Sequence, residues 1–187
     1  MKQPATPAGS REEGSQLFEL AIALPILFLL VVGVWDLGAG FALKQKLTNA
    51  AREAARITAG VPTNFVDTSG NPCSPAPCNI QAAVNSAVQY MNNAGLNASC
   101  LTSASPTFSA AQNGWTYSCN GITLEIDRGN GVAGPSTPVT LPDGRVVSVP
   151  ITQVGLVYPI TWTAGQLLPP PVPPQARTQV KMQNLAP

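Results

Sequence analysis

The run from Leu20 to Trp35 contains no charged residue, and Leu17 and Phe18 extend its apolar character toward the N-terminus. As a helix, residues 17–35 would measure about 28 Å at about 1.5 Å per residue, close to the roughly 30 Å hydrocarbon core of a bilayer. Trp35 falls at the far end, where an amphipathic ring suits the membrane–water interface. The run therefore predicts one membrane-spanning helix.

A secretory signal peptide is the competing interpretation, because Gly38-Ala39-Gly40 is similar to the small residues of a signal cleavage site. Against it, a helical pattern continues from Ala42 to Ala59, where Gly60 and Pro62 supply a stop. A signal peptide is normally cut away from a separate fold and is not fused to one long helix. We therefore expect one helix from Ser15 to Ala59, which would extend about 65 Å.

One face of this helix beyond the membrane is rich in small residues. Small side chains let helices approach closely, as membrane and bundle interfaces require. Two arrangements, which are compatible with each other, would bury this face: docking on the chain's own domain, and contact with the helix of another subunit. We name this face the alanine stripe, and it comprises Leu47, Ala50, Ala51, Ala54, Ala55 and Thr58.

Composition excludes several classes of function. The net charge is +1 and only 10% of the 187 residues are charged, so nucleic acid is not an expected partner. No histidine is present, which removes the commonest general base and metal ligand. Glu125 and Asp127 would share one face of a strand, but two acids on an exposed strand are usually just solvated. We expect no enzyme, no cofactor and no metal.

The four cysteines, Cys73, Cys78, Cys100 and Cys119, all follow the predicted span. They allow three pairings, of which Cys73 with Cys78 and Cys100 with Cys119 closes the shortest loops. Disulfides are the expected state in an oxidising compartment such as the periplasm. A four-cysteine zinc site is the alternative, disfavoured because the spacing lacks the close C-x-x-C pairs of a zinc ribbon.

The segment after Gly60 combines one helical pattern with several strands. Ile80 to Ala94 has apolar residues at helical spacing and is followed by Gly95 as a cap. Asn120-Gly121 and Pro142-Asp143-Gly144 each separate two alternating runs, which predicts two hairpins.

Two further strands are expected near the C-terminus. The first, Val154 to Thr163, contains Pro159, which suggests an edge or a bend, and the second is Arg177 to Met182. The proline-rich run Leu167 to Pro174 between them indicates a stiff connector, with a ligand for a peptide-recognition module as the alternative. The predicted fold class is α+β: a long N-terminal transmembrane and stalk helix, then a small antiparallel-sheet domain with one surface helix.

A glycine stands five residues before the acid at the head of the apolar helix: Gly14 and Glu19. Cleavage after Gly14 would make Ser15 the new N-terminus. This arrangement resembles the processing site of type IV prepilins and pseudopilins, and more closely the TadE-like family, the minor pseudopilins of the tight-adherence (Flp) pilus apparatus. The resemblance is also carried by Leu24-Pro25, Gly33-Val34-Trp35-Asp36-Leu37-Gly38 and Leu47-Thr48-Asn49-Ala50-Ala51-Arg52-Glu53-Ala54-Ala55-Arg56.

The resemblance implies a leader at residues 1–14, a transmembrane and stalk helix at 15–60 and an exported domain at 61–187. A prepilin peptidase would remove the leader, and other pilin or pseudopilin subunits would be partners in the membrane. The chain would be a single-pass protein of the bacterial inner membrane, with its C-terminal domain in the periplasm or outside the cell. Major Flp pilins are far shorter and usually carry tyrosine where Leu20 stands, so a minor subunit is expected.

Within this interpretation, Glu19 of one subunit would pair with the Ser15 ammonium of its neighbour, since a buried charge is tolerated when paired. Alternatively, Glu19 simply reaches into the lipid headgroups. An unprocessed, membrane-anchored periplasmic binding domain is the alternative function, with its ligand on loops 61–78 or 129–138.

The direction of insertion has two opposing signals. The basic residues after the span, Lys44, Lys46, Arg52 and Arg56, outnumber Lys2 and Arg11 before it, which favours the opposite orientation to the family's. The four cysteines all follow the span, and disulfides form in the periplasm, so they favour the family's orientation.

Overall fold

The computed structural model describes residues 12–61, 65–66, 70, 72–130, 132–160 and 175–184. The chain divides within α1, after Ala39, into two compact units. We call the second unit, which begins at Gly40, the sheet domain. The helices are α1 (Glu12–Gly60), α2 (Cys78–Asn93) and α3 (Cys100–Ser103). The strands are β1 (Thr107–Ser109), β2 (Gly114–Cys119), β3 (Ile122–Arg128), β4 (Ser136–Thr140), β5 (Val146–Pro159) and β6 (Gln175–Gln183).

The predicted long helix is confirmed as α1, which is continuous over 49 residues. It begins at Glu12, before the expected start at Ser15, and ends at Gly60 as expected. Pro25 lies inside it, where a proline removes one backbone hydrogen bond without ending the helix.

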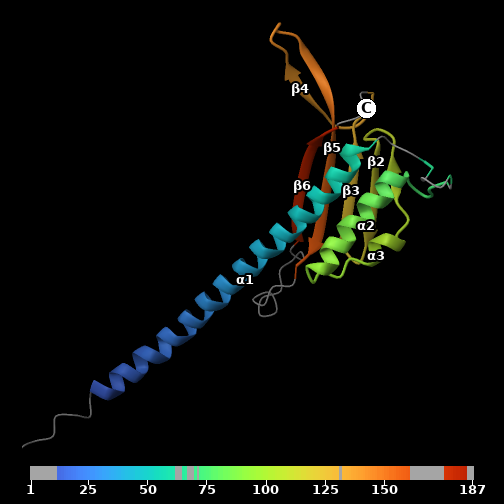
Figure 1. Ribbon diagram of the computed structural model, residues 1–187. Coiled ribbons are helices and arrows are strands. Elements are labelled where there is room, and N and C mark those ends of the chain that lie inside the picture. Colours follow the sequence, from blue (N-terminus) through green and yellow to red (C-terminus); the bar gives the residue numbers. More distant parts are fainter. Residues whose placement is uncertain are drawn as a thin grey trace, which may run out of the picture. The chain divides into compact units, whose positions relative to one another are not determined.

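The sheet is antiparallel throughout and has the strand order β1-β2-β3-β5-β4, with β6 also paired to β5 (Figure 1). Both predicted hairpins are confirmed. Asn120 and Gly121 have φ values of 48° and 78°, and positive φ at both central positions is what a two-residue hairpin turn of the favoured type requires. The β2–β3 register follows directly, with Cys119 opposite Ile122.

β5 differs from the prediction. The second strand of the second hairpin and the strand predicted from Val154 form a single element of 14 residues. Pro159 is its last residue and lies opposite Gln175, so the proline ends the strand and does not mark an edge. An internal strand tolerates a proline at its end because few ladder bonds are lost there. The run Leu167 to Pro174 lies outside the described residues.

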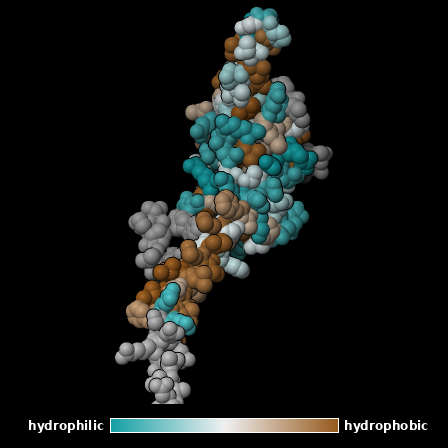
Figure 2. Space-filling view, turned by 90° about the vertical axis from the view of Figure 1, so that its left-hand side faces the viewer, coloured by the Kyte–Doolittle hydropathy of each residue, from teal (hydrophilic) through white to brown (hydrophobic). Residues whose placement is uncertain are grey.

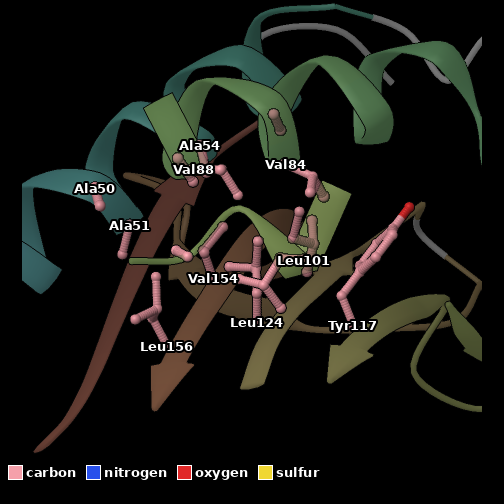
Figure 3. Close-up of a cluster of buried hydrophobic side chains, with 14 of the residues drawn as sticks. Ala50, Ala51, Ala54, Val84, Val88, Leu101, Tyr117, Leu124, Val154 and Leu156 are labelled. Carbon is pink, nitrogen blue, oxygen red and sulfur yellow. The ribbon is translucent and has the colours of Figure 1, made fainter. Parts of the chain in front are cut away.

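Helices α1 and α2 cover one face of the sheet, and their apolar side chains meet those of β2, β3 and β5 (Figures 1 and 3). The predicted α2 helix is confirmed, and its expected apolar face is buried. Gly95, at φ 81°, ends it: the Leu96 N–H donates to the Met91 carbonyl at 2.9 Å, the bonding of a glycine-terminated helix. The α+β fold class is therefore confirmed. The buried residues of α2 include Ile80, Ala83, Val84, Ala87, Val88 and Met91.

Candidate functional site

The N-terminal part of α1 carries an almost unbroken exposed apolar surface, brown in Figure 2. By length and composition, α1 is long and apolar enough to cross a membrane, and its most apolar window has no buried residue. A helix that is apolar all round is typical of a membrane span. This surface therefore fits a single-pass membrane anchor. Its large exposed side chains are Leu17, Phe18, Leu20, Ile22, Leu24, Ile26, Leu27, Phe28, Leu29, Leu30, Val31, Val34, Trp35, Leu37 and Phe41.

The predicted cleavage positions, Gly14 and Ser15, lie in the first turn of α1, and their side chains are outside what the structure describes. Glu19 follows one turn later, and it is exposed. Positions four apart on a helix are neighbours on one face, so α1 aligns position 15 with Glu19. At the other end of the apolar surface, Asp36 is 6% exposed, and it interacts with other groups of the chain.

The alanine stripe docks on the chain's own sheet, which is the first of the two arrangements expected from the sequence. All six of its residues are fully buried, and Figure 3 shows Ala50, Ala51 and Ala54 of α1 directed toward the strands. Thr48 adds a polar contact, because its Oγ1 lies 2.9 Å from Oγ1 of Thr178 in β6. Small residues allow the helix backbone to lie close to the sheet, and the stripe is thereby part of the domain core.

Two basic side chains form hydrogen bonds between α1 and other elements of the sheet domain. Arg128, at the end of β3, is 3% exposed, and its Nη1 donates to the Thr58 carbonyl at 2.8 Å and also to the Val61 carbonyl. The last carbonyls of a helix have no partners within the helix, so this guanidinium supplies them with donors. Lys46 Nζ donates to the Ala94 carbonyl at 2.8 Å, at the end of α2. Sequence reasoning missed both roles.

The cysteines form two disulfides, Cys73 with Cys78 and Cys100 with Cys119. The first closes the loop that leads into α2, and the second ties α3 to the end of β2. Both bonds lie in the sheet domain. Cross-links of this kind stabilise a domain chiefly by restricting the unfolded chain.

The two acids of β3 do not lie on an open, solvated face as expected. Asp127 is 4% exposed and its Oδ1 has no hydrogen-bond partner in the part of the chain that the structure describes, whereas Glu125 is half-buried. The expectation of solvation is therefore wrong for Asp127. Gly114 lies directly opposite Asp127 in β2. A Cβ at position 114 would lie 2.0 Å from Asp127 Oδ1, so a larger residue there would displace the carboxyl group. Among the described residues, no three His, Cys, Asp or Glu side chains gather as metal ligands would.

Burial, with a smaller contribution from the Glu125 charge, raises the pKa of Asp127 to about 6. A carboxyl with a raised folded-state pKa binds its proton more tightly in the folded chain, so its stabilising contribution is present below about pH 4 and is lost as pH rises through about 6. We expect Asp127→Asn to remove this loss and to raise the free energy of unfolding by about 1–2 kcal/mol at neutral pH.

Denaturant unfolding of both proteins between pH 4 and 8 measures this difference. Asp143→Asn is the control, because the Arg145 backbone N–H and side chain hold the pKa of Asp143 below its usual value. Because Asp143 titrates below its usual pKa, outside this pH range, the Asp143→Asn difference should not change between pH 4 and 8. An Asp127→Asn difference that does not change with pH would show that Asp127 is not the buried titrating group.

Residues 14–56 match the family model described as TadE-like protein. The match begins at Gly14 and ends within the part of α1 that docks on the sheet. No curated protein and no solved structure matches the chain. The family is the one that the order of Gly14, Glu19, the apolar run and the segment 47–56 indicated. Over residues 14–56, which form most of α1, the chain is therefore similar to TadE-like proteins.

Proposed function

We propose that this protein is a minor pilin-like structural subunit of a tight-adherence (Flp-type) pilus or a related secretion apparatus. The match of residues 14–56 to the TadE-like family carries this proposal. The exposed apolar surface of α1 supports it, since such a surface requires lipid or other apolar helices around it. In this role the chain performs no catalysis; α1 anchors the subunit and packs with pilin or pseudopilin helices in the membrane.

The proposed processing step is cleavage between Gly14 and Ser15 by a prepilin peptidase. That bond lies in the first turn of α1, where backbone N–H groups lack acceptors within the helix. Glycine is also a poor helix former and imposes no side chain on an approaching active site. The turn can therefore open into an extended strand at low cost.

After cleavage, we propose that Glu19 accepts the ammonium of Ser15 from a neighbouring subunit. A carboxylate in lipid is costly, by about 2.5 kcal/mol or more at the membrane centre, and such groups usually have a partner. Glu19 is exposed on α1, so a neighbour's terminus has access to it. Pairing would thus favour the assembled state over the isolated subunit.

Glu19→Gln tests this pairing. We expect at least about a tenfold fall in the amount of subunit that co-purifies with pilin-type subunits, because a neutral amide replaces the charge partner. Cleavage should continue. The matched control adds Gln16→Glu to the Glu19→Gln chain, which places an acid about one turn earlier on α1. This double variant should not recover co-purification with pilin-type subunits. Unchanged incorporation of Glu19→Gln would exclude the charge pair as a driving contact.

We further propose that the sheet domain lies in the periplasm or outside the cell, on a single-pass inner-membrane protein. Its two disulfides support this side, because they persist in oxidising compartments. The opposing count of basic residues carries less weight here, because Lys46, which donates to the Ala94 carbonyl, belongs to the sheet domain. Long loops and domains are translocated largely regardless of their charge.

A further inference from the structure

A small polar pocket of about 160 Å³ lies between α2, α3 and β2. Both disulfides adjoin it in sequence: Ser74 lies inside the loop closed by Cys73 and Cys78, while Thr102 and Tyr117 lie near Cys100 and Cys119. α2 contributes Gln81, Val84 and Asn85, which spacing along the helix brings to one face. The two cross-links thus hold the pocket walls in place.

Tyr117, one of the residues that line this pocket, carries the hydroxyl that most needs a partner. Tyr117 is 4% exposed, and its hydroxyl has no hydrogen-bond partner in the part of the chain that the structure describes. Figure 3 shows the ring beside the apolar cluster with the hydroxyl directed away from it. Burial raises the pKa of Tyr117 to about 12, so the hydroxyl is protonated at neutral pH and can donate a hydrogen bond.

The other polar groups of the pocket are neutral amides and hydroxyls. Gln81 Nε2 donates to the Ala76 carbonyl at 2.9 Å, which leaves its Oε1 as an acceptor. The Thr102 hydroxyl donates to the Ser99 carbonyl at 2.8 Å, so its oxygen can also accept. The lining therefore offers a donor in Tyr117 and acceptors in Gln81 and Thr102.

We propose that this pocket binds a neutral carboxamide, the group carried by an asparagine or glutamine side chain on a peptide segment of a partner protein. The Tyr117 hydroxyl donates to the amide oxygen, and the Gln81 or Thr102 oxygen accepts from the amide NH₂. A cavity of about 150 Å³ accommodates benzene, so the volume suits one such side chain.

Two other ligand classes fit less well. None of the residues that line the pocket is charged, so an ammonium or a carboxylate would lose its hydration without a counter-charge. The Tyr117 ring is buried, so the lining provides no aromatic face on which a sugar ring could stack. The pocket includes Ser74 from loop 61–78, one of the two loops on which the alternative binding-domain interpretation placed its ligand. The proposal does not depend on processing at Gly14.

The proposal is tested by amide-resolved NMR titration of the full chain in detergent micelles with N-acetyl-asparagine methylamide. We expect saturable shifts at Gln81, Asn85 and Thr102. Tyr117→Phe should weaken binding about fivefold through loss of one hydrogen bond while leaving the fold intact, because it removes an unpaired buried hydroxyl. Tyr90→Phe, on the exposed surface of α2, is the matched control and should bind as the unaltered chain does.

Parallel titrations use N-acetyl-aspartate methylamide, the charged analogue, and methyl glucoside. Weaker binding of both supports the proposal. Equal or tighter binding of either, unchanged affinity in Tyr117→Phe, or no saturable shift with the asparagine probe would overturn it. Retained spectra and disulfides in Tyr117→Phe establish that any loss concerns binding and not folding.

Discussion

Replacing Ala51 with leucine is expected to lower the free energy of unfolding of the sheet domain by about 3 kcal/mol. Ala51 is fully buried where α1 lies on the sheet, and Figure 3 shows it pointing toward the strands beside Leu156. Leucine adds three carbons where the close approach of helix and sheet depends on small residues. Alanine and leucine have similar helix propensities, so the loss measures packing and not helix formation.

Urea unfolding of the full chain in detergent micelles, followed by tryptophan fluorescence to which the buried Trp115 contributes, measures the change. Ala42→Leu is the matched control, since the same substitution on the same helix then falls on an exposed position. It should change stability by less than about 0.5 kcal/mol. Equal losses at the two positions would mean that the alanine stripe does not dock on the sheet in solution.

Arg128→Met is expected to lower the free energy of unfolding by about 2–3 kcal/mol. Methionine keeps much of the side-chain volume but donates no hydrogen bond to the Thr58 and Val61 carbonyls. Those carbonyls then lose a charged donor at the end of α1, where the helix itself supplies none. The last turn of α1 should therefore open more readily than the rest of the helix.

Hydrogen exchange localises this second effect. Amides of residues 56–60 should exchange faster in Arg128→Met, while those of the β3–β5 pairing change less. Arg177→Met is the control, because Arg177 is exposed on β6. Equal protection of the α1 terminus in Arg128→Met and the unaltered chain would show that Arg128 does not hold the helix end.

Periodicity along the sequence predicted those parts of the fold that depend on local patterns. Period-3.6 apolar spacing gave α1 and α2, and Asn120-Gly121 gave the β2–β3 hairpin with its register. Elements as short as α3 and β1, of four and three residues, leave too few positions for a period to show.

Contacts between distant segments could not be predicted in the same way. Arg128 and Thr58 are 70 positions apart, and nothing in either local sequence indicates that a helix end will meet a strand end. The burial of Asp127 likewise depends on what surrounds it in the folded sheet, which alternation along β3 does not reveal. Alternation correctly predicted that Glu125 and Asp127 lie on the same face of β3, but it did not predict that this face is largely buried.

The N-terminus of the membrane form tests the central proposal most directly. Intact mass together with N-terminal sequencing of the chain, purified from a host that has its prepilin peptidase, should give a mature protein that begins at Ser15. A chain that retains residues 1–14, or one cut after Gly38-Ala39-Gly40, would contradict the assignment as a processed pilin-like subunit.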